Sequence, residues 1–219
     1  MKTHYRRQLP HIQPIGAIFF ITTRLAGSLP NAVLKKLMQE HQEEINRIYQ
    51  NSAPGYKLEL YNAGKRYFQR FDKTLDAIKS GSHYFRDPEV AAILKKHLHR
   101  FDGDRYDLLA YTIMSNHIHF LIDTRVQVER IEKDGWVTEE NYDQVPEIMR
   151  MIKGASAFEI NQYLGRKGTF WQKESYDHFV RSRREFGNIV AYILNNPVKA
   201  GICEDWEGFE HNYSSPLLQ

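Results

Sequence analysis

The segment "RYDLLAYTIMSNHIHFLIDT" (residues 105–124) decides the fold that this sequence predicts. It contains two apolar runs rich in β-branched and aromatic residues, 105–114 and 117–124, and only Ser115 and Asn116 separate them. Short runs of this composition are typical of buried strands, and a two-residue connection is typical of a β-hairpin. The sequence therefore predicts an antiparallel hairpin near the middle of the chain.

Two histidines interrupt the second strand of this hairpin. Side chains at positions i and i+2 of a strand point to the same face, so His117 and His119 point together, whereas Ile118 and Phe120 point to the opposite, core side. Two neutral imidazoles on one face form half of a metal site. The alternative is a pair of half-exposed strand histidines that bind water.

The remaining elements follow from hydrophobic periodicity and from the Gly and Pro positions. Their order predicts βαββαβ, an α/β (α+β) ferredoxin-like sandwich with an antiparallel sheet and a mostly helical insertion after the first strand, over about residues 30–83. We expect strands at 16–23 and 168–182, helices at 31–48, 86–100, 145–164 and 183–198, helix or irregular structure at 56–81, and a polar loop at 125–145.

Length and composition narrow the class of protein. A chain of 219 residues fits one domain carrying an insertion, and a single cysteine excludes an intramolecular disulfide. No window of about 18 uncharged apolar residues occurs, and the first residues lack the apolar core of a signal peptide, so we expect no membrane span and a cytoplasmic, nucleoid-associated protein. The net charge of +3 is weak support for a nucleic-acid partner, and the clustering of basic residues is stronger support.

A second group of polar residues lies in "NIVAYILNNPV" (188–198). On a continuous helix, Tyr192 and Asn196 are four residues apart and share one face, and the helix has to finish before Pro197. The Asn196 amide oxygen could then complete the coordination of a metal ion beside the two histidines, with the Tyr192 phenol next to it. The alternative is a tyrosine packed in an amphipathic helix that an asparagine ends.

Three motifs in this order resemble a known family. The H-x-H strand, the segment containing Trp171, Gln172, Tyr176, Asp177, His178 and Arg181, and the "YILNNPVKAG" helix end (192–201) are similar to the single-tyrosine HUH transposases of the IS200-like family. Within that family, the sequence is most similar to the REP-associated tyrosine transposases. The resemblance covers about residues 5–29 and 84–216, and residues 30–83 lie outside it.

The resemblance implies metal-dependent binding, cleavage and rejoining of single-stranded DNA through a 5′-phosphotyrosine, in DNA transposition or REP mobilisation. It implies Tyr192 as nucleophile, His117, His119 and Asn196 as metal ligands, and Mg²⁺ or Mn²⁺ as cofactor. The implied partners are DNA hairpins of palindromic repeats, bound by a monomer or a homodimer. The expected DNA-binding residues are Arg6, Arg7, Arg166, Lys167, Trp171, His178, Arg181, Arg183, Arg184 and Lys199, with Trp171 stacking on unpaired bases.

Several alternatives remain at this point. Tyr176 is a second candidate nucleophile, and Asp177 is a candidate acceptor that orients a metal-ligating histidine. The chain could be a domesticated hairpin-binding protein without cleavage activity. It could also be an H-x-H metal hydrolase, in which Asp123 or Asp177 would have to activate water.

Overall fold

The structure is a computed structural model that describes residues 4–6, 10–51, 54–133 and 135–218, with only the backbone described for 4–6 and 10–12. Contacts along the chain divide it into two compact units, Met1–Ala26 with His83–Gln219, and Gly27–Ser82. The organisation expected from the sequence, one transposase-like domain with an insertion over about 30–83, stays a prediction.

The predicted hairpin forms the centre of the larger unit. Its strands are β4 (Asp107–Ile113) and β5 (His117–Asp123), which pair antiparallel in the register that places Thr112 opposite His119. The backbone N–H of Met114 donates to the His117 carbonyl at 2.9 Å and closes the tight turn. The first strand of the sequence prediction is also confirmed, as β3 (Ile18–Arg24), which pairs antiparallel with β5.

These strands belong to a five-stranded antiparallel sheet of order β6-β3-β5-β4-β7. Its first four strands have the order expected of the predicted βαββαβ arrangement, because each helical crossover leaves room for a strand between the two it connects. β7 (Asn212–Ser214) extends the sheet beyond β4. The ferredoxin-like mixed α/β fold is therefore confirmed. The other strands are β6 (Tyr176–Phe179) and the separate pair β1 (His4–Arg6) and β2 (Pro10–Ile12).

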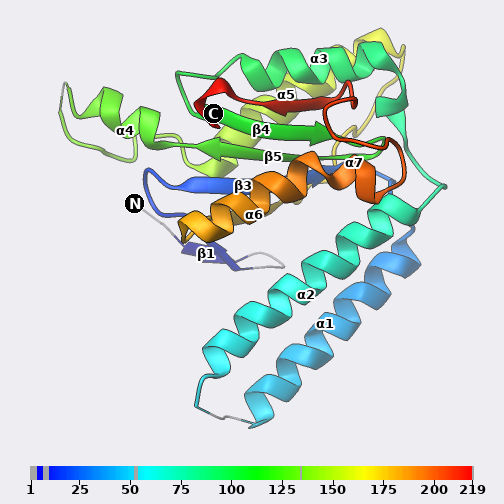
Figure 1. The fold of residues 1–219 in the computed structure, drawn as a ribbon, viewed down its shortest axis with the longest axis vertical. Helices are drawn as coiled ribbons and strands as arrows, with labels where there is room; N and C mark the ends of the chain where they lie inside the picture. Colours follow the sequence, from blue (N-terminus) through cyan, green and yellow to red (C-terminus); the bar gives the residue numbers. More distant parts are fainter. Residues whose placement is uncertain (1–3, 7–9, 52–53, 134, 219) are drawn as a thin grey trace. The chain divides into compact units, whose positions relative to one another are not determined.

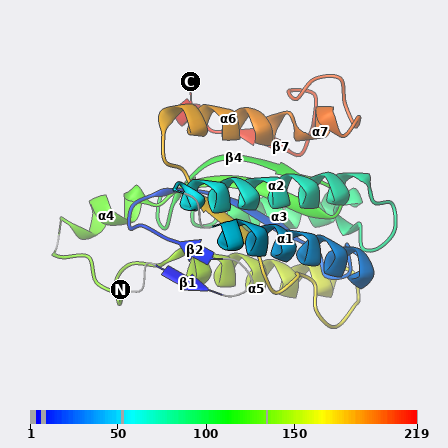
Figure 2. The same ribbon diagram turned by 90° about the horizontal axis from the view of Figure 1, so that it is seen from below.

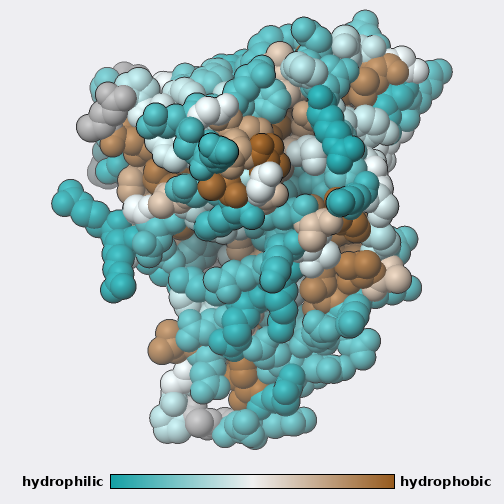
Figure 3. Space-filling view, turned by 45° about the vertical axis from the view of Figure 1, so that its right-hand side comes forward, coloured by the Kyte–Doolittle hydropathy of each residue, from teal (hydrophilic) through white to brown (hydrophobic). Residues whose placement is uncertain are grey.

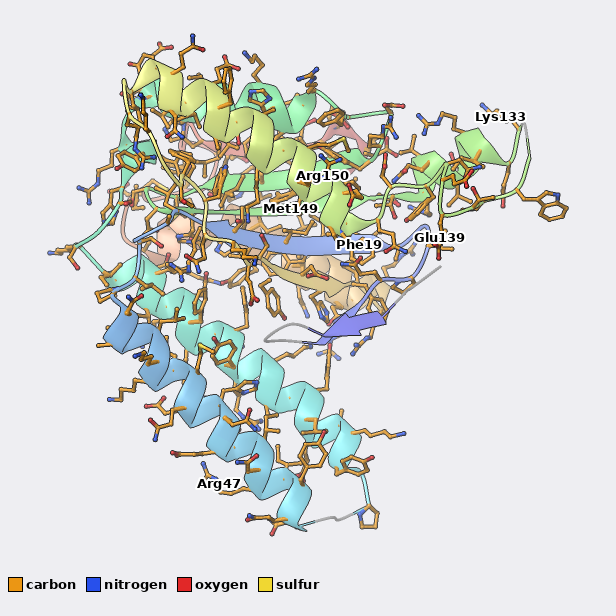
Figure 4. The ribbon with its side chains drawn as sticks, turned by 180° about the vertical axis from the view of Figure 1, so that it is seen from behind. Phe19, Arg47, Lys133, Glu139, Met149 and Arg150 are labelled. Atoms are coloured by element: carbon orange, nitrogen blue, oxygen red, sulfur yellow. The ribbon has the colours of Figure 1, made fainter. Side chains whose placement is uncertain are left out.

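Two helices cover the core face of the sheet, α3 (Pro88–His99) and α5 (Val145–Tyr163). Asp87 caps α3 as predicted, since its carboxylate accepts the Glu89 backbone N–H at 3.0 Å. Met149 of α5 and Phe19 of β3, both labelled in Figure 4, belong to the main hydrophobic cluster.

A third helix, α6 (Arg183–Leu194), lies on the other side of the sheet from α5 (Figure 2). It ends earlier than expected. The predicted helix 183–198 is divided into α6 and the short α7 (Asn196–Lys199), with Asn195 outside helical geometry between them. Pro197 accounts for the division, because its ring excludes a continuous helix and is tolerated in the first turn of a new one.

Two other expectations were wrong in part. The polar segment 125–145 contains a helix, α4 (Arg125–Ile131). The strand expected over 168–182 is reduced to β6 and an isolated antiparallel bridge between Trp171 and Leu25. The Lys153 ammonium donates to the Gln172 and Lys173 backbone carbonyls at 2.6 and 3.1 Å. These two carbonyls therefore accept from a side chain and not from a neighbouring strand. Short 3₁₀ helices at Tyr84–Arg86 and Pro216–Leu218 complete the unit.

The smaller unit is a pair of neighbouring helices, α1 (Asn31–Asn51) and α2 (Tyr56–Ala77), visible in Figure 1. The Glu44 carboxylate on α1 accepts from Arg66 and Arg70 on α2 at 2.7 and 3.2 Å. At the base of the pair, Gly81 has a φ of +94°, and a Cβ there would lie 2.4 Å from the Gly27 carbonyl oxygen. Only glycine fits this position.

The described helices include none that is both long and apolar enough to cross a membrane. Hydrophilic side chains cover most of the face in Figure 3, with brown hydrophobic patches between them. The cytoplasmic, nucleoid-associated location stays a prediction.

Candidate functional site

Pairing of the strands collects polar side chains on one face of the sheet, which we call the histidine face. It carries His117 and His119 of β5 with Thr22 of β3, which lies directly opposite His119. On the other side of β5, Thr112 of β4 also lies directly opposite His119. Residues directly opposite each other in adjacent strands share a face, so these four side chains belong together. The predicted common direction of the two histidines follows from this register.

The two imidazoles are close enough to share one ion. Their Nε2 atoms are 3.1 Å apart, and both side chains are fully buried, with 0% exposure. Two nitrogen ligands that each lie about 2.1 Å from a metal ion and subtend a right angle at it would be about 3 Å apart. The expectation of half-exposed, water-bound histidines is therefore wrong, and the pair could hold a metal ion.

Each histidine has a hydrogen-bond partner at its other ring nitrogen. The Asn116 side-chain oxygen lies 2.6 Å from His117 Nδ1, and the Thr22 hydroxyl lies 2.7 Å from His119 Nδ1. Metal-binding histidines usually carry such a partner, which fixes the ring orientation. Sequence reasoning missed both residues. Asn116 could have been noticed as the neighbour of His117, whereas Thr22 is identified only by the strand register.

Tyr192 of α6 lies directly against this pair. Its ring centroid is 5.5 Å from that of His119 and 5.9 Å from that of Phe20, which also stacks on His119 at 5.6 Å. The Lys199 ammonium lies over the Tyr192 ring, 4.8 Å from its centroid. The structure thus brings the predicted nucleophile to His119, one of the predicted metal ligands.

Asn196, the third expected ligand, sits on α7 rather than on the helix of Tyr192. The expectation that both lie on one continuous helix was wrong because the helix is interrupted at Asn195. Asn196 is nevertheless 1% exposed, and its Oδ1 is buried without a hydrogen-bond partner among the described residues. A buried amide oxygen without a partner costs roughly 1–3 kcal/mol, and a bound cation would remove that cost.

Both ends of α6 are fastened to the sheet that carries the histidines. At its C-terminus, the Asn212 amide of β7 donates to the Leu194 carbonyl at 2.9 Å. At its N-terminus, the Glu185 carboxylate lies 3.1 Å from His178 Nε2 of β6 and accepts the Arg181 backbone N–H at 3.0 Å. Ser182 caps the helix by accepting the Glu185 backbone N–H. These contacts fix the position of Tyr192.

Basic residues expected to contact DNA have different environments. A side chain has to be exposed to contact a DNA phosphate. The exposed ones are Lys167, Arg181, Arg183, Arg184 and Lys199. His178 is engaged with Glu185, and Arg166 donates to Asn161 Oδ1 and the Thr169 carbonyl while its guanidinium covers the Tyr84 ring. Of Arg6 only the backbone is described, and Arg7 lies outside the described residues.

The environment of Trp171 contradicts its expected role in DNA binding. Its side chain was expected to stack on unpaired bases, but it is 4% exposed and packs against Phe85 and Phe170 in the core. Its indole N–H donates to the Ser156 hydroxyl at 3.0 Å. Its ring faces are therefore occupied by protein, and the apolar, β-sheet-like character of 168–171 signalled burial rather than nucleic-acid contact.

The two carboxylates considered for water activation lie away from the histidines. Asp177 belongs to the opposite face of β6, because its neighbour Tyr176 is opposite Thr22, and it accepts from the Gln13 amide at 3.1 Å. Asp123 is four residues beyond His119 along β5, roughly 13 Å away at strand spacing, and it pairs with Arg125. Neither the orienting role of Asp177 nor water activation by Asp123 or Asp177 therefore has support.

A cavity of about 560 Å³ opens elsewhere in the larger unit, between α5 and the segment that leads into β6. Met149 and Arg150 of α5, both labelled in Figure 4, line it together with Trp171 and Asp177. It does not include the histidine pair or Tyr192. The candidate site is therefore the histidine face rather than this cavity.

One named relative agrees with the motifs. No family model matches the chain. A Haemophilus influenzae protein with the provisional name REP-associated tyrosine transposase is 26% identical over 104 residues, which is 46% of this chain and 56% of that protein. The matched region thus spans about half of its relative. A solved REP-associated tyrosine transposase bound to a REP hairpin has a TM-score of 0.49 and 16% identity, and the match covers 95% of this chain and 80% of the other. This chain is similar to the REP-associated tyrosine transposases, as its motifs predicted.

Proposed function

We propose that this protein is a transposase-like enzyme that binds single-stranded DNA hairpins and cleaves and rejoins the strand through Tyr192. One observation carries the proposal. The ring centroid of Tyr192 on α6 lies 5.5 Å from that of His119, and the Nε2 atoms of the buried His117 and His119 are 3.1 Å apart. The residue types match the family that the sequence resembles, and the named relative supports the same class of enzyme.

A phenol suits the covalent step. The Tyr192 oxygen would attack the scissile phosphorus and form an O–P bond, while the bond from phosphorus to the 3′-oxygen breaks. The phenolic proton is transferred to solvent or to the leaving oxygen, which becomes a 3′-hydroxyl, and the 5′-phosphate stays on Tyr192. With a pKa near 10, phenolate is also a competent leaving group, so the reverse attack rejoins the strand without hydrolysis.

His117, His119 and Asn196 would hold a divalent cation, Mg²⁺ or Mn²⁺. The fit rests on the paired Nε2 atoms and on the buried Asn196 oxygen, which has no hydrogen-bond partner in the described part of the chain. When bound, such an ion supplies Lewis-acid polarisation of the scissile phosphate. Imidazole ligands favour Mn²⁺ slightly over Mg²⁺.

The proposed substrate is a hairpin of a palindromic repeat, as the resemblance and the relative's name suggest. The exposed cations at the start of α6, Arg183 and Arg184, and Lys199 at the end of α7 would contact phosphates. Such contacts give affinity that falls steeply with salt concentration and carries little sequence preference.

We further propose that Tyr192 acts on DNA bound by its own chain. Asn212 holds one end of α6 to β7, and His178 with Glu185 holds the other end to β6. A helix fastened at both ends does not need a second copy to bring its tyrosine to the histidines. A monomer is therefore the expected active form.

Mixing the protein with an end-labelled hairpin and Mn²⁺, then denaturing it, tests the proposal. We expect a protein–DNA adduct with wild type and none with Tyr192→Phe, whereas Tyr176→Phe, the matched change on the same face, keeps it. Hairpin affinity should be unchanged in both variants. An adduct that survives in Tyr192→Phe would contradict the assignment. Hairpin binding without any wild-type adduct would instead favour the domesticated binding protein.

A further inference from the structure

The metal-binding atoms proposed above impose a requirement on the rest of each ring. A neutral imidazole carries one proton, and its Nε2 can bind a cation only when that proton is on Nδ1. The partner of Nδ1 therefore decides whether the Nε2 lone pair is available. Both Nδ1 atoms have a buried side-chain oxygen within hydrogen-bond distance, from Asn116 at 2.6 Å and from Thr22 at 2.7 Å.

The two partners differ in chemistry. An amide oxygen can only accept, so the Asn116 oxygen requires a proton on His117 Nδ1 and leaves the lone pair on Nε2. A hydroxyl both donates and accepts, so Thr22 can match either tautomer of His119 and can accept from Nδ1–H when Nε2 is a ligand. His117 is thus fixed in the metal-binding form, whereas His119 can adopt it.

We infer that Asn116 and Thr22 are positioning residues that set the tautomers of the two histidines, so that both Nε2 atoms face one divalent cation. The inference rests on the proposed function for the identity of the ligands. It assigns to these residues a role in metal affinity rather than in contacting DNA or phosphate.

The backbone around both residues supports this role. The Asn116 carbonyl accepts the Leu25 backbone N–H at 2.9 Å, which ties the hairpin turn to the end of β3. Thr22 lies directly opposite His119 in the β3–β5 ladder. Exposures of 1% for Asn116 and 3% for Thr22 exclude competition from bulk water. The hairpin turn therefore positions Asn116, and strand pairing positions Thr22, before any ion binds, so little has to be ordered when it does.

Metal affinity provides the first test. Mn²⁺ binding is measured without DNA, by titration calorimetry, for wild type and four variants. Loss of such partners typically weakens metal binding about 10- to 100-fold. We expect at least a roughly 10-fold loss for Asn116→Ala and Thr22→Val. Thr22→Ser keeps the hydroxyl, and Asn116→Asp keeps an accepting oxygen, so both should bind Mn²⁺ nearly as tightly as wild type.

Tautomers can be observed directly, which separates positioning from a merely structural role. In ¹⁵N-labelled protein, long-range ¹H–¹⁵N spectra of the rings distinguish Nδ1–H from Nε2–H, with His117→Gln and His119→Gln used for assignment. With Mg²⁺ alone as the ligand, wild type should show His117 and His119 as Nδ1–H. Without metal, His117 should keep Nδ1–H, and in Asn116→Ala it should lose this preference.

Wild-type His117 protonated on Nε2, or an Asn116→Ala variant with unchanged Mn²⁺ affinity, would overturn the inference. If Asn116→Ala does not fold, the wild-type spectra and the Thr22→Val and Thr22→Ser pair still decide it. Failure of the proposed function is recognised separately: wild type would then form no covalent adduct with hairpin DNA, whatever its tautomers are.

Discussion

Adjacent residues of β5 send their side chains to opposite faces of one sheet, and the two faces differ in chemistry. Ile118 and Phe120 lie on the core face with 1% and 0% exposure, packed with residues of α3 and α5. His117 and His119, also 0% exposed, lie on the other face, where Tyr192 packs against His119. Burial is therefore equal, whereas hydrogen bonding differs: the histidine face contains polar atoms that need specific partners.

The difference suggests a division of tasks. Apolar side chains stabilise a fold in proportion to the area they bury, whereas a buried polar group is costly unless it is paired. Asn196 Oδ1, buried without a partner among the described residues, is an example of this cost on the side of α6. We expect the core face to set the stability and the histidine face to set metal binding, and four experiments test this separation.

The largest effect on stability is expected on the core face. Phe120→Ala removes a fully buried ring from the centre of β5 and should lower the free energy of unfolding by about 3–5 kcal/mol. Denaturant titration measures the loss. At temperatures where the variant is folded, the adduct formed per folded molecule should match wild type. A reduced yield per folded molecule would show that the two faces are coupled.

Metal binding should stabilise the protein through the histidine face alone. At a Mn²⁺ concentration of about 100 times Kd, binding adds about 2.7 kcal/mol to the free energy of unfolding. His117→Gln should abolish this gain, whereas Phe120→Leu, a core change of matched position, should keep it. Calorimetric melting with and without Mn²⁺ provides the measurement. A gain that persists in His117→Gln would place the ion elsewhere.

Alkaline pH should act on the core face. Tyr111 lies opposite Phe120, and burial raises the pKa of its phenol to about 12. The unfolded chain, with a tyrosine pKa near 10, then loses this proton before the folded chain does. Stability should consequently fall between pH 10 and 12, by about 1.4 kcal/mol per pH unit at most. Unfolding curves of Tyr111→Phe should show a smaller slope over that range. An equal slope would exclude Tyr111 as its source.

The smallest effect concerns the fastening of α6. Glu185→Ala removes the acceptor of His178 Nε2 and of the Arg181 backbone N–H and should cost about 1 kcal/mol. Glu207→Ala, at an exposed position, is the control and should change stability little. Because α6 carries Tyr192, adduct formation should fall in Glu185→Ala while Mn²⁺ affinity stays constant. Loss of Mn²⁺ affinity would contradict the assignment of this contact to the helix alone.

Much of the fold was predictable because local signals were strong. The alternation of β5, the Asp87 cap and the apolar periodicity of α5 each depend on neighbouring residues and predicted the observed elements. Predictions failed where a side chain from another element bound the backbone carbonyls, or where a proline interrupted a helix. Lys153 binds carbonyls of the segment expected to be a long strand, and Pro197 moves Asn196 onto a new helix.

The candidate site shows the same limit. The motifs predicted His117, His119, Tyr192 and Asn196, but they also suggested Trp171, which the core buries. They could not indicate Thr22, because its relation to His119 exists only in the register of β3 against β5. The sequence shows which residue types are present, whereas strand pairing determines which of them are in contact.

The sequence by itself determined the hairpin, the common direction of His117 and His119 and the βαββαβ order, because strand alternation and helix periodicity are local properties of the chain. Tertiary structure alone decided that Tyr192 lies against His119, that Asn116 and Thr22 occupy the two Nδ1 atoms, and that Asp177 faces away. The physical reason is that these contacts join segments far apart in sequence, and only the pairing and packing of complete elements bring such segments together.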